Sequence, residues 1–243
     1  MTGKYKIAEK IIEIISLYPD VHEYCRDYVS DEAADFTVQT DMHDIEYEQK
    51  RSDEENIREG KRTVEYSGGY LEELAVYRKI AEKMIEFDTV LFHGSVIAVD
   101  GTGFLFTAKS GTGKSTHTRL WREVFGERAV MVNDDKPLLR ITDNRVIAYG
   151  TPYNGKHRLG NNISVPLKAL CILERAEKNS IVKVSKMNVY ATLIQQIYRP
   201  ADSAKLKKIL ELADKLAENT DIYRLGCNME RDAAVVSYEG MRD

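Results

Sequence analysis

Residues 104–116 read FLFTAKSGTGKST, which places an apolar segment, a glycine-rich turn and a helix-forming segment in direct succession. The turn, residues 108–115, departs from the phosphate-binding pattern G-x-x-x-x-G-K-[ST] at its first position, where Ala108 replaces glycine. Gly111 and Gly113 allow consecutive backbone N–H groups to point at phosphate oxygens, and the positive end of the following helix adds to the same site. The stretch therefore predicts a strand, a phosphate-binding loop and a helix.

The residues of this loop are expected to divide the binding of a nucleotide among them. Lys114 would reach the β- and γ-phosphates, and the Ser115 hydroxyl would ligate Mg²⁺. Thr116, on the first helical turn, is expected near the α-phosphate. The candidate nucleotide-binding residues of the loop are Ser110, Gly111, Thr112, Gly113, Lys114, Ser115 and Thr116.

A second apolar segment ends in two carboxylates further along the chain. Residues 129–132 (AVMV) run into Asn133, Asp134, Asp135 and Lys136. A P-loop enzyme needs a carboxylate at a strand end to hold Mg²⁺ opposite the serine hydroxyl. Two adjacent carboxylates permit one to bind the metal while the other accepts a proton from an attacking hydroxyl.

These elements together resemble HPr kinase/phosphorylase and the wider group that it shares with the phosphoenolpyruvate carboxykinases. The resemblance rests on their order: His93-Gly94 opening the strand FHGSVIAVDG, a hairpin, FLFTAKSGTGKST, a helix, and a strand that ends VNDDK. It covers residues 90–175 well, whereas residues 1–66 have no counterpart in HPr kinase proper. The chain is most similar to small HPr-kinase-related proteins, some of them associated with peptide-modification systems.

The resemblance implies an α/β P-loop kinase fold with a mixed β-sheet, and it implies ATP and Mg²⁺ as cofactors. Asp134 matches the position of the family's catalytic base, Asp135 that of the metal-side carboxylate, and His93 that of the histidine supporting this acidic pair. The candidate catalytic residues are therefore Asp134, Lys114 and His93, and the candidate metal ligands are Ser115 and Asp135.

The sequence departs from this family in residues 149–162 (YGTPYNGKHRLGNN). HPr kinases carry a metal-binding glutamate and an Arg-Gly-Leu-Gly stretch after the acidic segment, and this region contains no glutamate. Residues 155–158 are nevertheless rich in cationic donors, which could close over the phosphates or bind an acidic acceptor. Lys156 is accordingly a candidate phosphate ligand, and Arg199 is a candidate for a further positive charge near the γ-phosphate.

Composition narrows the setting in which this chemistry is expected. The chain has 243 residues, a formal net charge of −4 and 43% hydrophobic residues, which is ordinary for a globular protein with a real core. Mild acidity gives no reason to expect nucleic acid as a partner, and no apolar run is long enough to cross a bilayer. Three widely spaced cysteines suit a reducing cytoplasm. Assembly into a homo-oligomer stays open.

Patterning predicts a small α+β appendage over residues 1–66, a candidate for acceptor recognition, and a kinase-like body over residues 67–243. The apolar residues between 7 and 18 fit either a helix or two short strands. The other expected helices are residues 21–29, 69–87, 114–125, 186–198 and 202–218, with a last one from Glu230. Strands are expected at residues 89–100, 104–108, 129–133, 137–142, 145–150, 167–176, 180–185 and 221–227.

The expected reaction is transfer of the γ-phosphoryl group of ATP to a hydroxyl, that of a serine in a small protein or peptide or that of a small metabolite. Three other functions stay open at this stage. The chain could be a non-catalytic ATP-binding sensor or interaction protein, a carboxykinase-like enzyme, or a simple NTPase.

Overall fold

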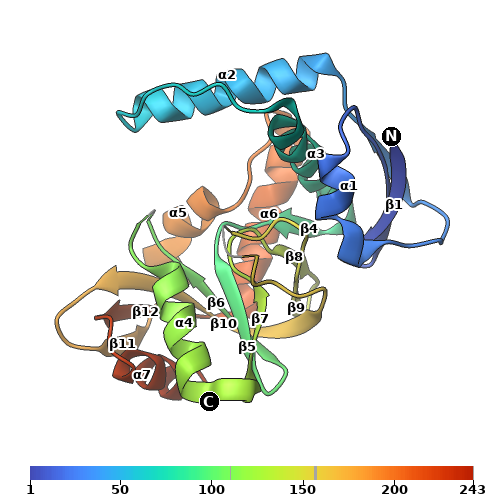
Figure 1. Cartoon of the computed structure of the whole chain (residues 1–243). Helices are drawn as coiled ribbons and strands as arrows, with labels where there is room; N and C mark the ends of the chain where they lie inside the picture. Colours follow the sequence, from blue (N-terminus) through green and yellow to red (C-terminus); the bar gives the residue numbers. More distant parts are fainter. Residues whose placement is uncertain (110, 156–157, 243) are drawn as a thin grey trace. The chain divides into compact units, whose positions relative to one another are not determined.

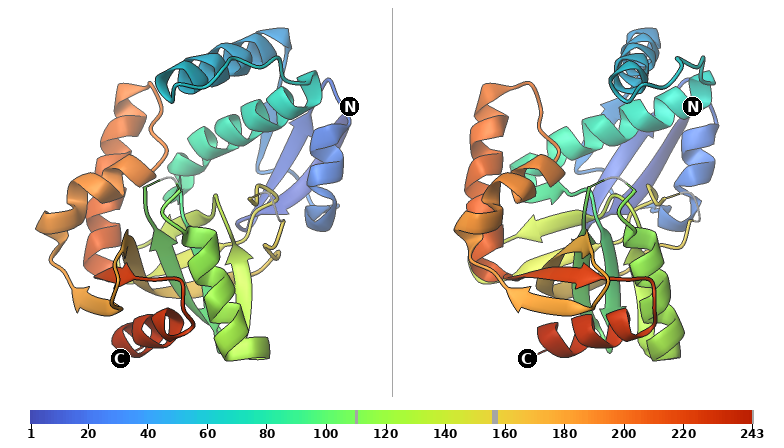
Figure 2. Two further views of the ribbon diagram at one scale, coloured as in Figure 1. Left: turned by 60° about the vertical axis from the view of Figure 1, so that its left-hand side comes forward. Right: turned by 90° about the vertical axis from the view of Figure 1, so that its left-hand side faces the viewer.

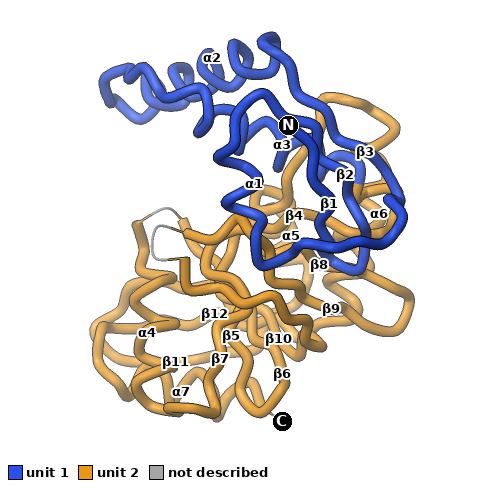
Figure 3. The backbone as a smooth tube through the Cα atoms, turned by 45° about the vertical axis from the view of Figure 1, so that its right-hand side comes forward, with its two compact units in different colours: residues 1–83 blue, residues 84–243 orange. Residues whose placement is uncertain are grey.

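The computed structural model describes residues 1–109, 111–155 and 158–242, and the chain divides into two compact units, Met1–Lys83 and Met84–Asp243 (Figure 3). The sequence placed this division after residue 66, ahead of helix α3 (Gly68–Met84). The structure assigns nearly all of α3 to the first unit. The physical reason is that Glu72 and Arg78, both on this helix, hydrogen-bond to other residues of that unit.

The first unit is a three-stranded sheet with helices. Its strands run in the order β1-β2-β3, with β1 and β2 antiparallel and β2 and β3 parallel. Ala8 and Glu9 both have positive φ, as a two-residue hairpin turn of the favoured twist requires, and this turn makes residues 2–15 two strands rather than one helix. Besides α3, the elements of this unit are β1 (Thr2–Ile7), β2 (Lys10–Ile15), α1 (Asp20–Tyr24), η1 (Arg26–Tyr28), β3 (Phe36–Gln39) and α2 (Met42–Arg58).

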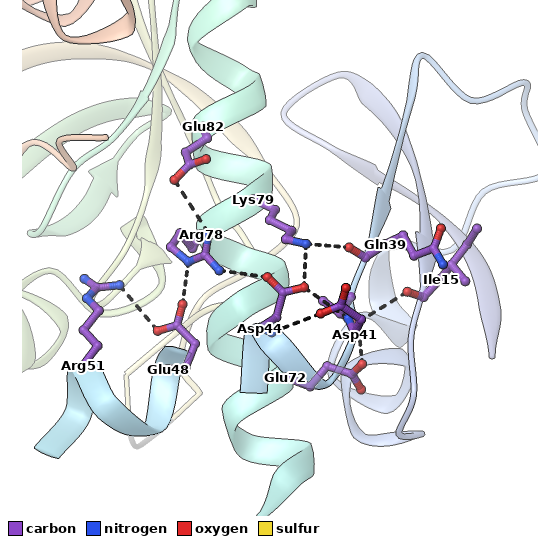
Figure 4. A network of polar contacts seen from close by, with 11 residues as sticks. Ile15, Gln39, Asp41, Asp44, Glu48, Arg51, Glu72, Arg78, Lys79 and Glu82 are labelled. Carbon is purple, nitrogen blue, oxygen red and sulfur yellow. Dashed lines mark hydrogen bonds and ion pairs between the residues drawn. The ribbon is translucent and has the colours of Figure 1, made fainter. Parts of the chain in front are cut away.

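Ion pairs join α2 to α3 within this unit (Figure 4). The Arg78 guanidinium donates to Glu48 at 2.5 Å and to Asp44 at 3.1 Å, and Lys79 donates to Asp44 at 2.6 Å. Asp44 also completes a capping box with Asp41 at the start of α2. Because α2 buries few apolar side chains, these polar contacts fix its position against α3.

The second unit is built on one large mixed sheet. Its strands follow the order β4-β8-β9-β10-β6-β5-β7, and β12 pairs with both β10 and β11. β10 runs parallel to β6 and β12, while the other pairs are antiparallel. This confirms the predicted α/β fold with a mixed sheet. The strands are β4 (Thr89–Leu91), β5 (Ser95–Val99), β6 (Thr102–Thr107), β7 (Ala129–Asn133), β8 (Leu138–Ile141), β9 (Val146–Tyr149), β10 (Ser164–Arg175), β11 (Ser180–Lys183) and β12 (Asp221–Cys227).

Helices cover both faces of this sheet (Figures 1 and 2). Side chains alternate along β6, so that Leu105 faces the core under α5 and α6, while Phe104 and Phe106 face the core under α4 and α7. The predicted limits of α4 are confirmed at both ends. The helical elements are η2 (Ile85–Phe87), α4 (Lys114–Phe125), η3 (Gly126–Arg128), α5 (Lys186–Gln196), α6 (Ser203–Asn219) and α7 (Asp232–Met241).

Two sequence expectations are corrected. The strand expected over residues 89–100 is interrupted at Phe92–Gly94, because β4 pairs with β8 whereas β5 pairs with β6 and β7. The helix expected over residues 21–29 is one short turn, α1, followed by η1. In the part of the chain that the structure describes, no helix combines the length and the apolar character needed to cross a membrane.

Helix α4 is anchored by a buried aromatic cluster. Trp121 is fully buried between Phe104 and Phe106, and its Nε1 lies 3.1 Å from His117 Nε2 and 2.9 Å from Ser237 Oγ. His117 is 2% exposed, and burial lowers its pKa to about 4. Both residues therefore pack in the core, and their spacing of four along α4 places them on one face of the helix.

Glu72 should be a stability determinant of the first unit. Its buried carboxylate accepts hydrogen bonds from Leu17 N, Tyr18 N and the Thr40 hydroxyl. Glu72→Ala should lower the free energy of unfolding by about 2–4 kcal/mol, because these donors lose their acceptor, and Glu72→Gln should lose less. Urea unfolding checks the size of the effect. If the hydrogen-exchange rates of the Leu17 and Tyr18 amides were the same in Glu72→Ala as in wild type, this stabilising role of Glu72 would be contradicted.

His117 should make folding stability depend on pH. The unfolded chain protonates this ring near its ordinary pKa of 6.5, whereas the folded chain resists until about pH 4. The unfolded state therefore binds more protons between these values, and the free energy of unfolding falls as pH falls through that window. Going from about pH 7 to about pH 5 should cost about 2 kcal/mol through this group. Urea titrations of wild type and His117→Gln test this, and parallel pH slopes for the two proteins would refute it.

Candidate functional site

The glycine-rich loop connects the buried end of β6 to the first turn of α4. Gly111 and Gly113 have φ of +74° and +122°, values that glycine adopts without the strain of a side chain. A Cβ on Gly111 would meet no atom within 4 Å, so the backbone conformation rather than crowding requires glycine there. Ser110, a candidate phosphate ligand, lies outside the described residues.

The start of α4 offers backbone donors to an anion. The N-cap is Gly113, which has no side chain to accept a hydrogen bond from the first N–H groups of the helix. The first bond within the helix runs from the His117 N–H to the Gly113 carbonyl. The N–H groups of Lys114, Ser115 and Thr116 occupy the positions that have no acceptor inside a helix. This end of the helix, together with its dipole, is suited to bind phosphate.

Lys114, His93 and Asp135 form one cluster. Lys114 Nζ lies 3.3 Å from His93 Nε2, which lies 3.6 Å from Asp135 Oδ1. Burial lowers the pKa of Lys114, and the Asp135 carboxylate opposes part of that shift. Burial and then the Lys114 cation lower the pKa of His93, while Asp135 raises it in part. His93 is therefore neutral at physiological pH, and its ring can accept a hydrogen bond from the lysine.

The two neighbouring carboxylates contact different residues. Asn133 Oδ1 accepts the N–H groups of Asp135 and Lys136, and the Ser95 hydroxyl donates to the Asp134 carbonyl. This bracing turns Asp135 toward His93, whereas the Asp134 side chain is 6% exposed and accepts Gly155 N–H at 2.5 Å. The sequence indicated two roles for the pair but gave no sign of this divergence.

Two pockets lie beside the first turns of α4. The loop-side pocket, of about 480 Å³, is lined by Gly111, Thr112, Gly113, Thr116, His117, Leu173, Arg175, Ala176, Cys227, Asn228 and Met229. The Asp134 pocket, of about 470 Å³, is lined by Ser115, Thr116, Thr118, Arg119, Arg122, Asp134 and Leu159. Thr116, on the first turn of α4, lines both pockets.

The predicted site residues thus fall into two adjoining groups. His93, Lys114 and Asp135 cluster together, and Ser115 shares the Asp134 pocket with Asp134. Arg199 is exposed and comes shortly after Gln196, whose carbonyl accepts the His93 N–H. Lys156 lies outside the described residues.

Two arginines belong to this region without having been singled out in the sequence. Arg175 donates to the Gly111 carbonyl at 2.6 Å from the end of β10, and Arg122 lines the Asp134 pocket from α4. The parallel pairing of β10 with β6 brings Arg175 to the loop, and no sequence signal foretells that pairing. The spacing of Arg122 from Ser115 on a helix was available as a signal.

Comparisons with known proteins place the chain as follows. Residues 70–236 match the model of a protein family described as SynChlorMet cassette protein ScmC. A solved structure titled as the Hpr(Ser) kinase/phosphatase from Coxiella burnetii is similar over 62% of this chain and 95% of that chain, with 12% identity and a TM-score of 0.36. No curated protein matches the chain.

Gly113→Ala should weaken nucleotide binding without unfolding the protein. An alanine at φ +122° is strained by about 1–3 kcal/mol, so the loop would relax and its N–H groups would no longer converge. We expect ATP affinity to fall about tenfold or more, as measured by titration calorimetry with Mg²⁺. Gly60→Ala, at a positive-φ glycine in the other unit, is the matched control. Equal ATP affinities for the two variants would contradict the assignment of this loop.

Proposed function

The chain belongs to the ScmC family of SynChlorMet cassette proteins, and from the geometry of its site we propose that it is an ATP- and Mg²⁺-dependent kinase that phosphorylates a hydroxyl. A serine of a small protein or peptide is the preferred acceptor. One observation carries the proposal: the Ser115 hydroxyl and the Asp134 carboxylate line one pocket beside a helix start suited to phosphate.

The nucleotide would be bound from the loop outward. The N–H groups at the start of α4 and the Lys114 ammonium would hold the β- and γ-phosphates. The loop-side pocket continues from this point and offers apolar surface from Leu173 and Met229 with a polar group from Asn228. That combination suits a nucleoside, because ligand pockets are mostly apolar with a few orienting polar groups.

Oxygen donors of the type that Mg²⁺ prefers are present at the helix start and, in Asp135, in the adjoining group with His93 and Lys114. Ser115 offers a hydroxyl oxygen and Asp135 a carboxylate oxygen, and the described residues contain no cluster of three or more His, Cys, Asp or Glu side chains that would hold a metal alone. Mg²⁺ is commonly bound by one or two protein oxygens together with substrate phosphates and water. When bound, the ion would neutralise charge on the phosphate oxygens.

Phosphoryl transfer then needs a base for the acceptor hydroxyl, and it needs the attacking and leaving oxygens to be in line. Asp134 would take the proton of the acceptor hydroxyl as the new O–P bond forms and the bond between the γ-phosphorus and the bridging oxygen breaks, releasing ADP. Lys114 would stabilise the negative charge on the departing phosphate oxygens. His93 acts as a positioning residue, since its neutral ring lies between the Lys114 ammonium and the Asp135 carboxylate.

The test is transfer of labelled γ-phosphate from ATP, with Mg²⁺, to cell extract separated into peptide and small-molecule fractions. Wild type should label a species that Asp134→Asn labels at least about 100-fold more slowly, because a general base contributes that much. Asp143→Asn, an exposed aspartate in the turn between β8 and β9, should behave as wild type. Asp134→Asn should still bind ATP.

The other outcomes separate the competing functions. Label recovered only as inorganic phosphate, at a rate that no extract changes, would point to an NTPase. ATP binding with no label transfer at all would overturn the kinase and leave a nucleotide sensor. Bicarbonate release from an oxoacid would indicate a carboxykinase.

A further inference from the structure

Arg122 lines the Asp134 pocket and has no partner for its charge among the described residues. Its side chain is half-buried and its Nε is buried, yet no hydrogen bond or ion pair engages it within the described part of the chain. Removing a charged group from water without a compensating partner is unfavourable. A half-buried, unpaired guanidinium in a pocket wall is therefore a site that an anion would stabilise.

The neighbouring charges do not satisfy Arg122. Arg119, one turn earlier on α4, is paired with Glu123, and Glu123 also faces Arg231 at 3.5 Å. Asp134 lines the same pocket, but its carboxylate accepts the Gly155 N–H. Of the two arginines that line the pocket, Arg119 is paired, whereas no described residue matches the charge of Arg122.

The positions of Ser115 and Arg122 on α4 set the distance between the proposed phosphate site and the arginine. Ser115, Arg119 and Arg122 are spaced four and three residues apart, which places them on one face of α4, and this face lines the pocket. Seven residues of helix span about 10 Å. An extended peptide covers that distance in about three residues, and the length of the arginine side chain shortens it.

We propose that the Asp134 pocket is the acceptor site, and that Arg122 binds a carboxylate located about two or three residues from the phosphorylated serine. This rests on the proposed kinase function, because Ser115 and Asp134 mark the pocket end where phosphate would be transferred. A planar guanidinium binds a carboxylate through two parallel hydrogen bonds, which favours an acidic side chain or a C-terminal carboxylate as the group recognised.

Binding of short synthetic peptides tests this without requiring turnover. The probes are fluorescein-labelled peptides of serine, two glycines and glutamate, blocked at both ends, and the same peptide with glutamine. A second pair, serine followed by three glycines with a free or an amidated C-terminus, separates the two sources of carboxylate. Fluorescence anisotropy is measured with a non-hydrolysable ATP analogue and Mg²⁺.

Wild type should bind the glutamate peptide, or the peptide with the free C-terminus, about tenfold more tightly than its neutral counterpart. Arg122→Gln should abolish that preference, and Arg145→Gln, which removes an exposed positive charge outside the pocket, should keep it. Arg122→Glu should instead favour a lysine peptide.

Equal binding of charged and neutral peptides by wild type would overturn the proposal, and this comparison needs no variant. A charge preference that survives in Arg122→Gln would overturn the role of Arg122. The kinase proposal fails separately: a protein that selects the carboxylate through Arg122 but transfers no labelled phosphate keeps the anion site and loses the kinase function.

Discussion

The reversal of the chain between β6 and α4 is the constraint on which the candidate site depends. β6 is buried in the sheet between β5 and β10, and α4 must start within a few residues of its end. Positive φ at Gly111 and Gly113 makes that short connection possible. Trp121 then fixes the helix against Phe104 and Phe106 on β6 itself. The N–H groups at the start of α4 are consequently held by the core of the unit, so the anion binding proposed for them would need little further ordering.

Hydrogen bonds to the backbone of residues 134–136 hold the two aspartates of the site in place. Asn133 closes a turn that exposes two neighbouring carboxylates to different surroundings: Asp135 lies near His93 and Lys114, while Asp134 is buried against Gly155. Two adjacent carboxylates facing one metal would repel each other, and in the proposed kinase their different partners would let Asp135 serve as a metal ligand and Asp134 as a proton acceptor. This arrangement would fail if β5, which supplies Ser95, did not lie beside β7.

Local sequence signals predicted the elements that local physics decides. The limits of α4 follow from glycines at both of its ends, and Asp202 caps α6 as expected. The prediction of one continuous strand over residues 89–100 was wrong. Both halves are apolar, so the sequence shows no break, and the break arises because β4 and β5 pair with different strands. The sequence could not distinguish a helix from two strands near the N-terminus, because isoleucines suit both. The turn at Ala8 and Glu9 makes this segment two strands.

The sequence by itself determined the succession of strand, glycine-rich turn and helix, the acidic segment at a strand end and the mixed α/β character of the chain, because each rests on residue types at short spacing. Tertiary structure decided which of these groups meet. Pairing of β10 with β6 brings Arg175 to the Gly111 carbonyl, and the Gly155 N–H donates to Asp134, which lines one pocket together with Arg122. Such contacts depend on strand order and on side-chain surroundings far apart in the chain, which no local pattern encodes.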